Sequence, residues 1–127
     1  MNRPFFAFSM ALAFCAAAPA LGHHSAVQFD FQNPVNLTGV VKVAQFANPH
    51  AKIILEVTDD KRGTRDIEFE GHSRNNMYRQ GFRPNMMQTG DKITVRIAPM
   101  KDGSDGGYVT ALITADGHAI GNITRAD

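Results

Sequence analysis

The sequence has little that would support thiol chemistry, aromatic stacking or the binding of a polyanion. It contains one cysteine, Cys15, and no tryptophan among its 127 residues. Thirteen Lys and Arg against twelve Asp and Glu leave a formal charge of +1, which provides no field to hold a nucleic acid. We therefore expect no nucleic-acid partner. The length is that of one domain.

Residues 1–22 have the pattern of a secretory signal peptide. One positive charge, Arg3, precedes an apolar stretch over residues 5–14, and small residues follow it. This stretch is shorter than the roughly 20 apolar residues that a membrane-spanning helix needs. We therefore expect export to the periplasm and no membrane association once the segment has been removed.

Small residues at positions −3 and −1 allow two cleavage sites, after Gly22 or after Ala20. Either cut removes Cys15, and the mature chain then has no cysteine. This excludes disulfides, thiolate catalysis and thiolate metal ligands. Cleavage after Gly22 would leave residues 23–127, which contain all five histidines.

The mature sequence alternates between apolar and polar side chains with the period of a β-strand. The runs cover residues 37–46, 51–57, 65–70, 92–97 and 108–115, and an Asp-Gly turn at 116–117 predicts a short sixth strand over 118–121. The side chains expected inside are Ile53, Leu55, Ile67, Phe69, Ile93, Val95, Ile97 and Val109.

One short helix is expected between the third and fourth strands. Ser73 is its predicted N-cap and Gly81 its predicted end. Three strands, a helix, two strands and a terminal hairpin follow the order of the OB-fold. We therefore predict one domain over 23–127, mainly β, built as a small five-stranded antiparallel OB-like barrel. Another small β-barrel or sandwich is the alternative, and residues 101–107 are expected to form a mobile loop.

Several short motifs resemble those of a known family. They occur in the order His23-His24-Ser25, Phe29-Asp30, Gly39, Asn48-Pro49-His50, Arg79 with Gly81, Gly90-Asp91 and Lys101-Asp102-Gly103. This pattern resembles the exported bacterial proteins grouped as domain-of-unknown-function family 6152. Members generally begin the mature chain at or next to the His pair, so the resemblance favours cleavage after Gly22. The family has no settled activity, and the resemblance implies compartment and fold.

The N-terminal histidines are the candidate metal ligands. Cleavage after Gly22 would give His23 a free α-amino group beside two imidazoles, a nitrogen-rich set suited to Cu(II). Cleavage after Ala20 would place His23 third from the amine, which also favours Cu(II) or Ni(II). The alternative is that His23 and His24 are polar residues in a flexible terminus.

The Asn48-Pro49-His50 corner is the second candidate site. It connects the first two strands, where OB barrels border their binding face. We therefore assign ligand binding to Asn48, His50 and Arg79, and a third copper position to His50. The alternative is a turn held by Asn48 and Pro49 with an exposed histidine.

The remaining charged groups are given structural interpretations. His72 and His118 are interpreted as surface histidines, either solvated or hydrogen-bonded. Glu70 and its strand neighbours Asp66 and Glu68 are interpreted as partners of the helix arginines or as solvated groups.

These observations favour a small exported binding or accessory protein over an enzyme. Its ligand would be a small molecule or a protein partner. The alternative is a periplasmic copper-binding protein that uses the N-terminal His pair. The sequence requires no cofactor, and copper is the one it favours.

We predict that the protein recovered from a periplasmic extract begins at His23, because signal peptidase removes residues 1–22. Intact-mass spectrometry measures this directly. Replacing Ala20 and Gly22 with bulky residues should retain the segment, since both small positions are then lost. Recovery of the wild-type form that still begins at Met1 would contradict the prediction.

Overall fold

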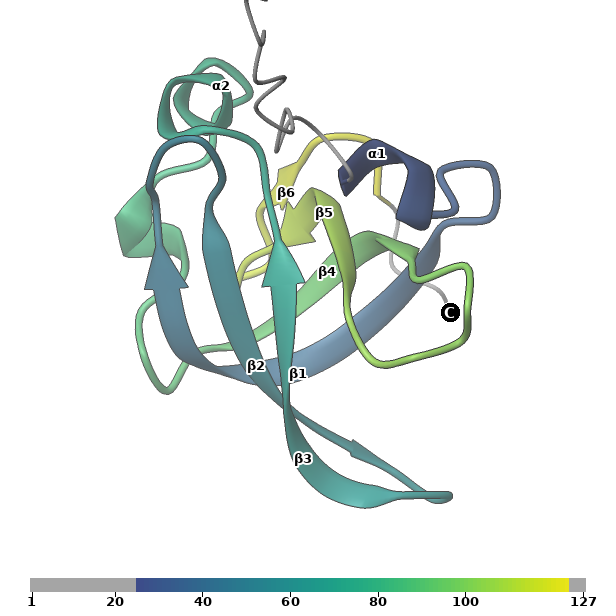
Figure 1. Ribbon diagram of the computed structural model, residues 1–127. Coiled ribbons are helices and arrows are strands. Elements are labelled where there is room, and N and C mark those ends of the chain that lie inside the picture. Colours follow the sequence, from purple (N-terminus) through teal and green to yellow (C-terminus); the bar gives the residue numbers. More distant parts are fainter. Residues whose placement is uncertain (1–24, 124–127) are drawn as a thin grey trace, which may run out of the picture.

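The computed structural model describes residues 25–123, which form a small barrel with short helices at one end (Figure 1). In chain order the elements are α1 (Ser25–Gln28), β1 (Val35–Gln45), β2 (Lys52–Asp59), β3 (Gly63–Glu70), α2 (Arg74–Arg79), the 3₁₀ helix η1 (Pro84–Met86), β4 (Lys92–Pro99), β5 (Gly107–Ile113) and β6 (Ala119–Ile120). Every predicted strand agrees with the observed one to within two residues at each end.

The strands form one sheet in the order β3-β2-β1-β4-β5-β6. Each neighbouring pair in that order is antiparallel. A further bridge, between Glu70 of β3 and Tyr108 of β5, closes the first five strands into a barrel and leaves β6 outside the ring. This connectivity confirms the predicted OB-like fold.

The closing pair is parallel, whereas the sequence led us to predict an antiparallel barrel throughout. The reason is geometric. Strand directions in a closed ring can alternate completely only when the number of strands is even. With five strands, one neighbouring pair must run in the same direction, and here that pair is β3 and β5.

Strand β1 belongs to both halves of the barrel. Its first half pairs with β4 and its second half with β2, and the two sets of pairs meet at Val40. A Cβ atom on Gly39 would lie 2.8 Å from the carbonyl oxygen of Glu56, so glycine is required for this close approach. A register shift between Val41 and Val43 bends the strand further.

The main core fills the inside of the barrel, and all the side chains predicted to lie there are buried. Met77 of α2 and Met87 after η1 complete it. The turn between β5 and β6 forms as predicted. The end of α2 at Gly81 also agrees with the prediction, since Gly81 has φ +98°.

Strand β5 is buried on both of its faces, which is why its sequence is almost continuously apolar. Its outer face is covered by two smaller clusters. One consists of Phe29, Ala98 and Tyr108 with Met100 packed against them, and Phe29 follows directly on α1. Helix α1 is a single turn, which is too short for a sequence pattern to show a helical period.

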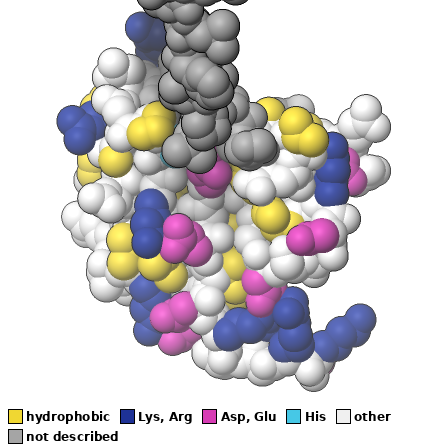
Figure 2. Space-filling model, viewed as in Figure 1, with side chains coloured by type: hydrophobic (Ala, Val, Ile, Leu, Met, Phe, Trp, Pro, Cys, Tyr) yellow, Lys and Arg dark blue, Asp and Glu magenta, His cyan; other side chains and the backbone are white. Residues whose placement is uncertain are grey.

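Charges of both signs alternate over the face that contains β2 and β3 (Figure 2). Lys52 pairs with Glu68 across the two strands at 3.0 Å. Arg65 donates to Asp59 at 2.6 Å and to Asp105 at 2.8 Å, so the loop that we expected to be mobile is attached to β3. Within residues 25–123, none of the helices has the length and apolar character needed to cross a membrane.

We predict that Val95→Asp unfolds the domain. Val95 has 0% exposure in the middle of β4, so the carboxylate would be buried without a partner at a cost of at least about 3 kcal/mol. Thermal and denaturant unfolding measure the effect. Lys92→Asp, which is exposed on the same strand, should retain nearly wild-type stability. An unchanged melting temperature in Val95→Asp would contradict the core assignment.

Candidate functional site

Two histidines, His50 and His72, lie just before the start of β2 and just after the end of β3. The strand register ends where Lys52 pairs with Glu70, and His50 and His72 lie two residues beyond that pair on their own segments. The backbone is held together beyond the strand ends, since the N–H of Ala51 donates to the carbonyl oxygen of His72 at 2.9 Å. The N–H of Gly71 also donates to the carbonyl oxygen of Ala51 at 2.9 Å, so Gly71 and His72 both lie opposite Ala51 and the strand period is interrupted there.

The imidazole of His50 is oriented by two acceptors on one nitrogen. Its Nδ1 lies 3.0 Å from Oε1 of Glu70 and 3.3 Å from the carbonyl oxygen of Gly71. Because a carboxylate and a carbonyl can only accept, the Nδ1 atom carries the hydrogen and donates it. In the neutral ring the lone pair is therefore on Nε2, the atom available to a ligand.

The imidazole of His72 is held by Tyr108. The hydroxyl of Tyr108 lies 2.8 Å from Nδ1 of His72, and the two rings meet edge to face with centroids 5.0 Å apart. Burial, and next the charge of His50, lower the pKa of His72. Burial, and next the carboxylate of Glu70, raise the pKa of Tyr108. Both side chains are therefore neutral at neutral pH.

Tyr108 also connects this cluster to the N-terminal helix. Its ring packs against Phe29 with centroids 5.4 Å apart and against Phe31 at 5.5 Å. Phe29 is 3% exposed, whereas Phe31 is 47% exposed. We call His50, Glu70, His72 and Tyr108 the imidazole corner. The segment that contains α1 is thus attached next to it.

Asn48 has a structural role at this corner. Its Oδ1 accepts a hydrogen bond from the backbone N–H of Arg74 at 3.1 Å, which caps the first turn of α2 from outside the helix. Ser73, the predicted cap, makes no capping side-chain bond. The sequence missed this because the capping partner lies 26 residues away.

Arg79 is not brought to the corner by any observed contact, since its guanidinium donates to Asn76 of its own helix at 3.4 Å. Arg74 donates to the carbonyl oxygen of Phe46 at 3.0 Å, and Arg83 to those of Tyr78 and Phe82. One interpretation of the sequence paired Glu70 with an arginine of the helix region. In the structure Glu70 pairs with His50 instead.

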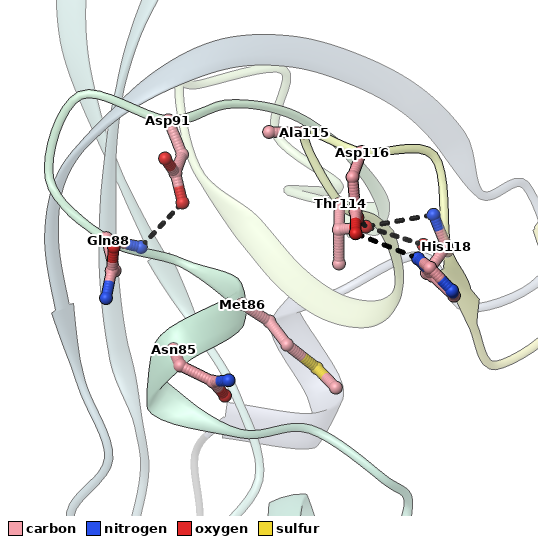
Figure 3. Close-up of a pocket in the computed structure, with 8 residues that line it drawn as sticks. All are labelled: Asn85, Met86, Gln88, Asp91, Thr114, Ala115, Asp116 and His118. Carbon is pink, nitrogen blue, oxygen red and sulfur yellow. Dashed lines mark hydrogen bonds and ion pairs between the residues drawn. The ribbon is translucent and has the colours of Figure 1, made fainter.

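A depression lies between η1 and the turn that joins β5 to β6 (Figure 3). It contains a threonine, an aspartate and a histidine, the residue types of a hydrolytic triad. Here, however, the hydroxyl of Thr114 donates to the carboxylate of Asp116 and accepts from the backbone N–H of His118 at 2.9 Å, and it does not donate to the imidazole. Asp116 also pairs with Nδ1 of His118 at 3.0 Å. The arrangement is a hydrogen-bonded turn and does not activate a nucleophile.

Sequence reasoning identified His50 but missed the contributions of Glu70, His72 and Tyr108. His118 is exposed, as predicted, with 77% of its side-chain surface accessible. His72 is hydrogen-bonded but half-buried. A signal for Glu70 was available, because it ends a strand whose neighbour leads back to His50.

His23 and His24 lie outside the described residues. Among residues 25–123, no three His, Cys, Asp or Glu side chains form a group that could hold a metal ion. The imidazole corner contains two imidazoles, those of His50 and His72.

The fold and the imidazole corner define a small OB-like β-barrel with a polar site beside its closing seam. The chain belongs to the Family of unknown function (DUF6152), whose sequence model matches residues 11–110. The family predicted from the motifs is thereby confirmed. No curated protein and no solved structure matches the sequence.

We predict that His72 in the metal-free protein titrates with a pKa below its ordinary value of 6.5, because burial and His50 both disfavour the charged ring. In His50→Ala the pKa should rise, since one of the two causes is gone, while burial keeps it below the ordinary value. Imidazole proton shifts measured by NMR across pH provide the test, with the signal of His118 as internal reference. An unchanged curve for His72 in His50→Ala would show that the two rings do not interact.

Proposed function

We propose that this protein is an exported binding module that holds a Cu(II) ion at the imidazole corner, using His23, His24 and His50. The observation that carries the proposal is the attachment of α1 beside the corner. Phe29 is buried against Tyr108, and the hydroxyl of Tyr108 contacts His72, whose carbonyl oxygen accepts from Ala51, the residue after His50. Residues 25–29, which follow the His pair, are therefore attached next to the imidazole corner.

The chain length between Phe29 and the His pair permits this arrangement. One helical turn over α1 rises about 1.5 Å per residue, so Ser25 lies about 6 Å from Phe29 along the helix axis. Two further residues add at most about 3.5 Å each. The chain length therefore allows the Cα atoms of His23 and His24 to lie at most about 13 Å from that of Phe29.

The donor chemistry supports Cu(II). An α-amino nitrogen and imidazole nitrogens form the tetragonal nitrogen set that Cu(II) prefers. His50 would add Nε2, the nitrogen that its bond to Glu70 leaves accessible. Affinity should fall at low pH because protons compete for the same nitrogens.

A broader form of the proposal is a binding module for a small ligand or a protein partner at the same place. The exposed ring of Phe31, packed edge-on against Tyr108, supports it because exposed aromatic side chains are enriched in interfaces. Both forms assign the protein to binding and not to catalysis. Both also assume export to the periplasm.

We predict that processed protein beginning at His23 binds Cu(II), and that His23→Ala and His50→Ala each weaken binding by about tenfold or more. Loss of either ligand removes one nitrogen from the metal. Titration against a competing chelator, monitored by calorimetry or absorbance, measures the affinity. His118→Ala removes an exposed imidazole elsewhere and is the matched control.

A second comparison tests the free amine. Protein with one extra residue before His23 keeps every imidazole and displaces only the terminal amine, so its affinity should also decrease. Equal affinity with and without that residue would exclude the amine. Unchanged affinity in both His23→Ala and His50→Ala would overturn the proposed copper site.

A further inference from the structure

We propose that the open mouth of the barrel, at the end away from α2, binds a free single-chain alkyl carboxylate. The alkyl chain of the ligand lies against apolar side chains inside the mouth, and its carboxylate binds Arg62 at the rim. The site consists of residues other than those of the imidazole corner, so the inference goes beyond the proposed copper site and is independent of it.

The mouth forms where the strands of the barrel separate. Strand β1 pairs with β2 only from Val40 onward, so among the described strands residues 57–59 of β2 pair with β3 alone. The resulting hairpin extends beyond the barrel, away from α2 (Figure 1). A cavity of about 450 Å³ lies between this hairpin, the start of β1 and the loop that leads into β5. Small-molecule sites have volumes of about 300 to 1,000 Å³ and commonly occupy the mouths of β-barrels.

The inside of the mouth is apolar and accessible. Val41 of β1 is fully buried in the barrel, and the strand period places Leu37 and Val35 on the same inner face. Leu37 packs against the main core, yet it is only half-buried, and Val35 is 45% exposed. Three buried core side chains form the floor of the cavity: Val57, Ile67 and Ile97. None of the described helices lines this opening, so inward-facing apolar side chains remain in contact with solvent.

The rim of the mouth is charged, because the inner face of the hairpin changes from apolar to ionic. Arg65 lies two residues before Ile67 and is fully engaged. Its guanidinium donates to Asp59 at 2.6 Å and to both carboxylate oxygens of Asp105, at 2.8 and 3.1 Å. Both carboxylates that line the mouth are therefore paired, and neither requires a cation from a ligand.

Arg62 is the rim cation with donors left for a ligand. A guanidinium has five N–H donors. Within residues 25–123 the Arg62 side chain contacts only Asp105, through Nη2 at 2.6 Å, and it is 55% exposed. Figure 2 shows Lys and Arg side chains that project from this hairpin. A guanidinium beside an apolar cavity is complementary to a carboxylate attached to an apolar chain.

The lining also selects the chemistry of the chain. A sugar or a peptide backbone in this cavity would lose hydrogen bonds to water against Leu37, Val57 and Ile97, which offer no side-chain donor or acceptor. An alkyl chain loses none, and each methylene that leaves water favours binding. We therefore expect dodecanoate to bind more tightly than octanoate, by about twofold or more for each added methylene.

The test uses metal-free mature protein that begins at His23, with dodecanoate below its micelle-forming concentration as the probe. Calorimetry measures the affinity. Val35→Glu should weaken binding by about tenfold or more, because it places a negative charge in the mouth and removes apolar surface. Val43→Glu is the matched control. Val43 is 39% exposed on the same strand and lies opposite Ile54 on the outer face, so its affinity should be unchanged.

A second comparison tests the head group. Arg62→Gln should weaken dodecanoate binding by about three- to tenfold, a modest change because the rim is exposed to solvent. The same variant should bind dodecanol, which has no charge, as tightly as wild-type protein does. Lys92→Gln removes an exposed cation at the other end of β4 and should leave both affinities unchanged.

Three outcomes would overturn the inference. They are no binding of millimolar dodecanoate by wild-type protein, equal affinity in Val35→Glu and Val43→Glu, and binding to anionic phosphatidylglycerol vesicles without binding of free dodecanoate. If Val35→Glu lowers the melting temperature, NMR of wild-type protein decides, since dodecanoate must shift the methyl signals of Leu37 and Ile97. Cu(II) titrations use other residues, so neither result determines the other.

Discussion

The parallel contact between β3 and β5 is the constraint on which the rest of the structure depends. A ring of five strands must contain one parallel pair, and here the pair is Glu70 with Tyr108. The same contact places the carboxylate that holds His50 beside the phenol that holds His72. Closing the barrel and assembling the imidazole corner are therefore one event, and the corner exists only in the folded domain.

A polar cluster at a packed seam is stable only when its groups are satisfied. Within residues 25–123, no buried side-chain nitrogen or oxygen lacks a hydrogen-bond partner. Phe29 and Tyr108 bury apolar surface on the outer face of β5, a second core outside the barrel. This packing gives α1 its position, although a single helical turn would be unstable alone. Residues 25–29 are thus fixed by hydrophobic burial, while the imidazoles of His50 and His72 are fixed by hydrogen bonds.

The alternation of apolar residues predicted the strands, the order of elements and the main core, because Ile53, Val95 and Val109 each follow period two. Local patterns failed where the partner is distant in sequence. Ser73 was the obvious cap for α2, yet Asn48 forms the bond to Arg74 from the preceding corner. His72 had no local feature to distinguish it from His118, and only its neighbour Tyr108 on another strand makes them different.

The sequence by itself determined the β-barrel class, the residues inside it and the histidines that could serve as ligands, because periodicity and residue chemistry are local properties. The tertiary structure alone decided that Glu70 orients His50, that Tyr108 orients His72, and that Phe29 attaches the N-terminal segment beside them. The physical reason is that these contacts join segments separated by 20 to 80 residues, and strand register and closure fix which of those segments meet.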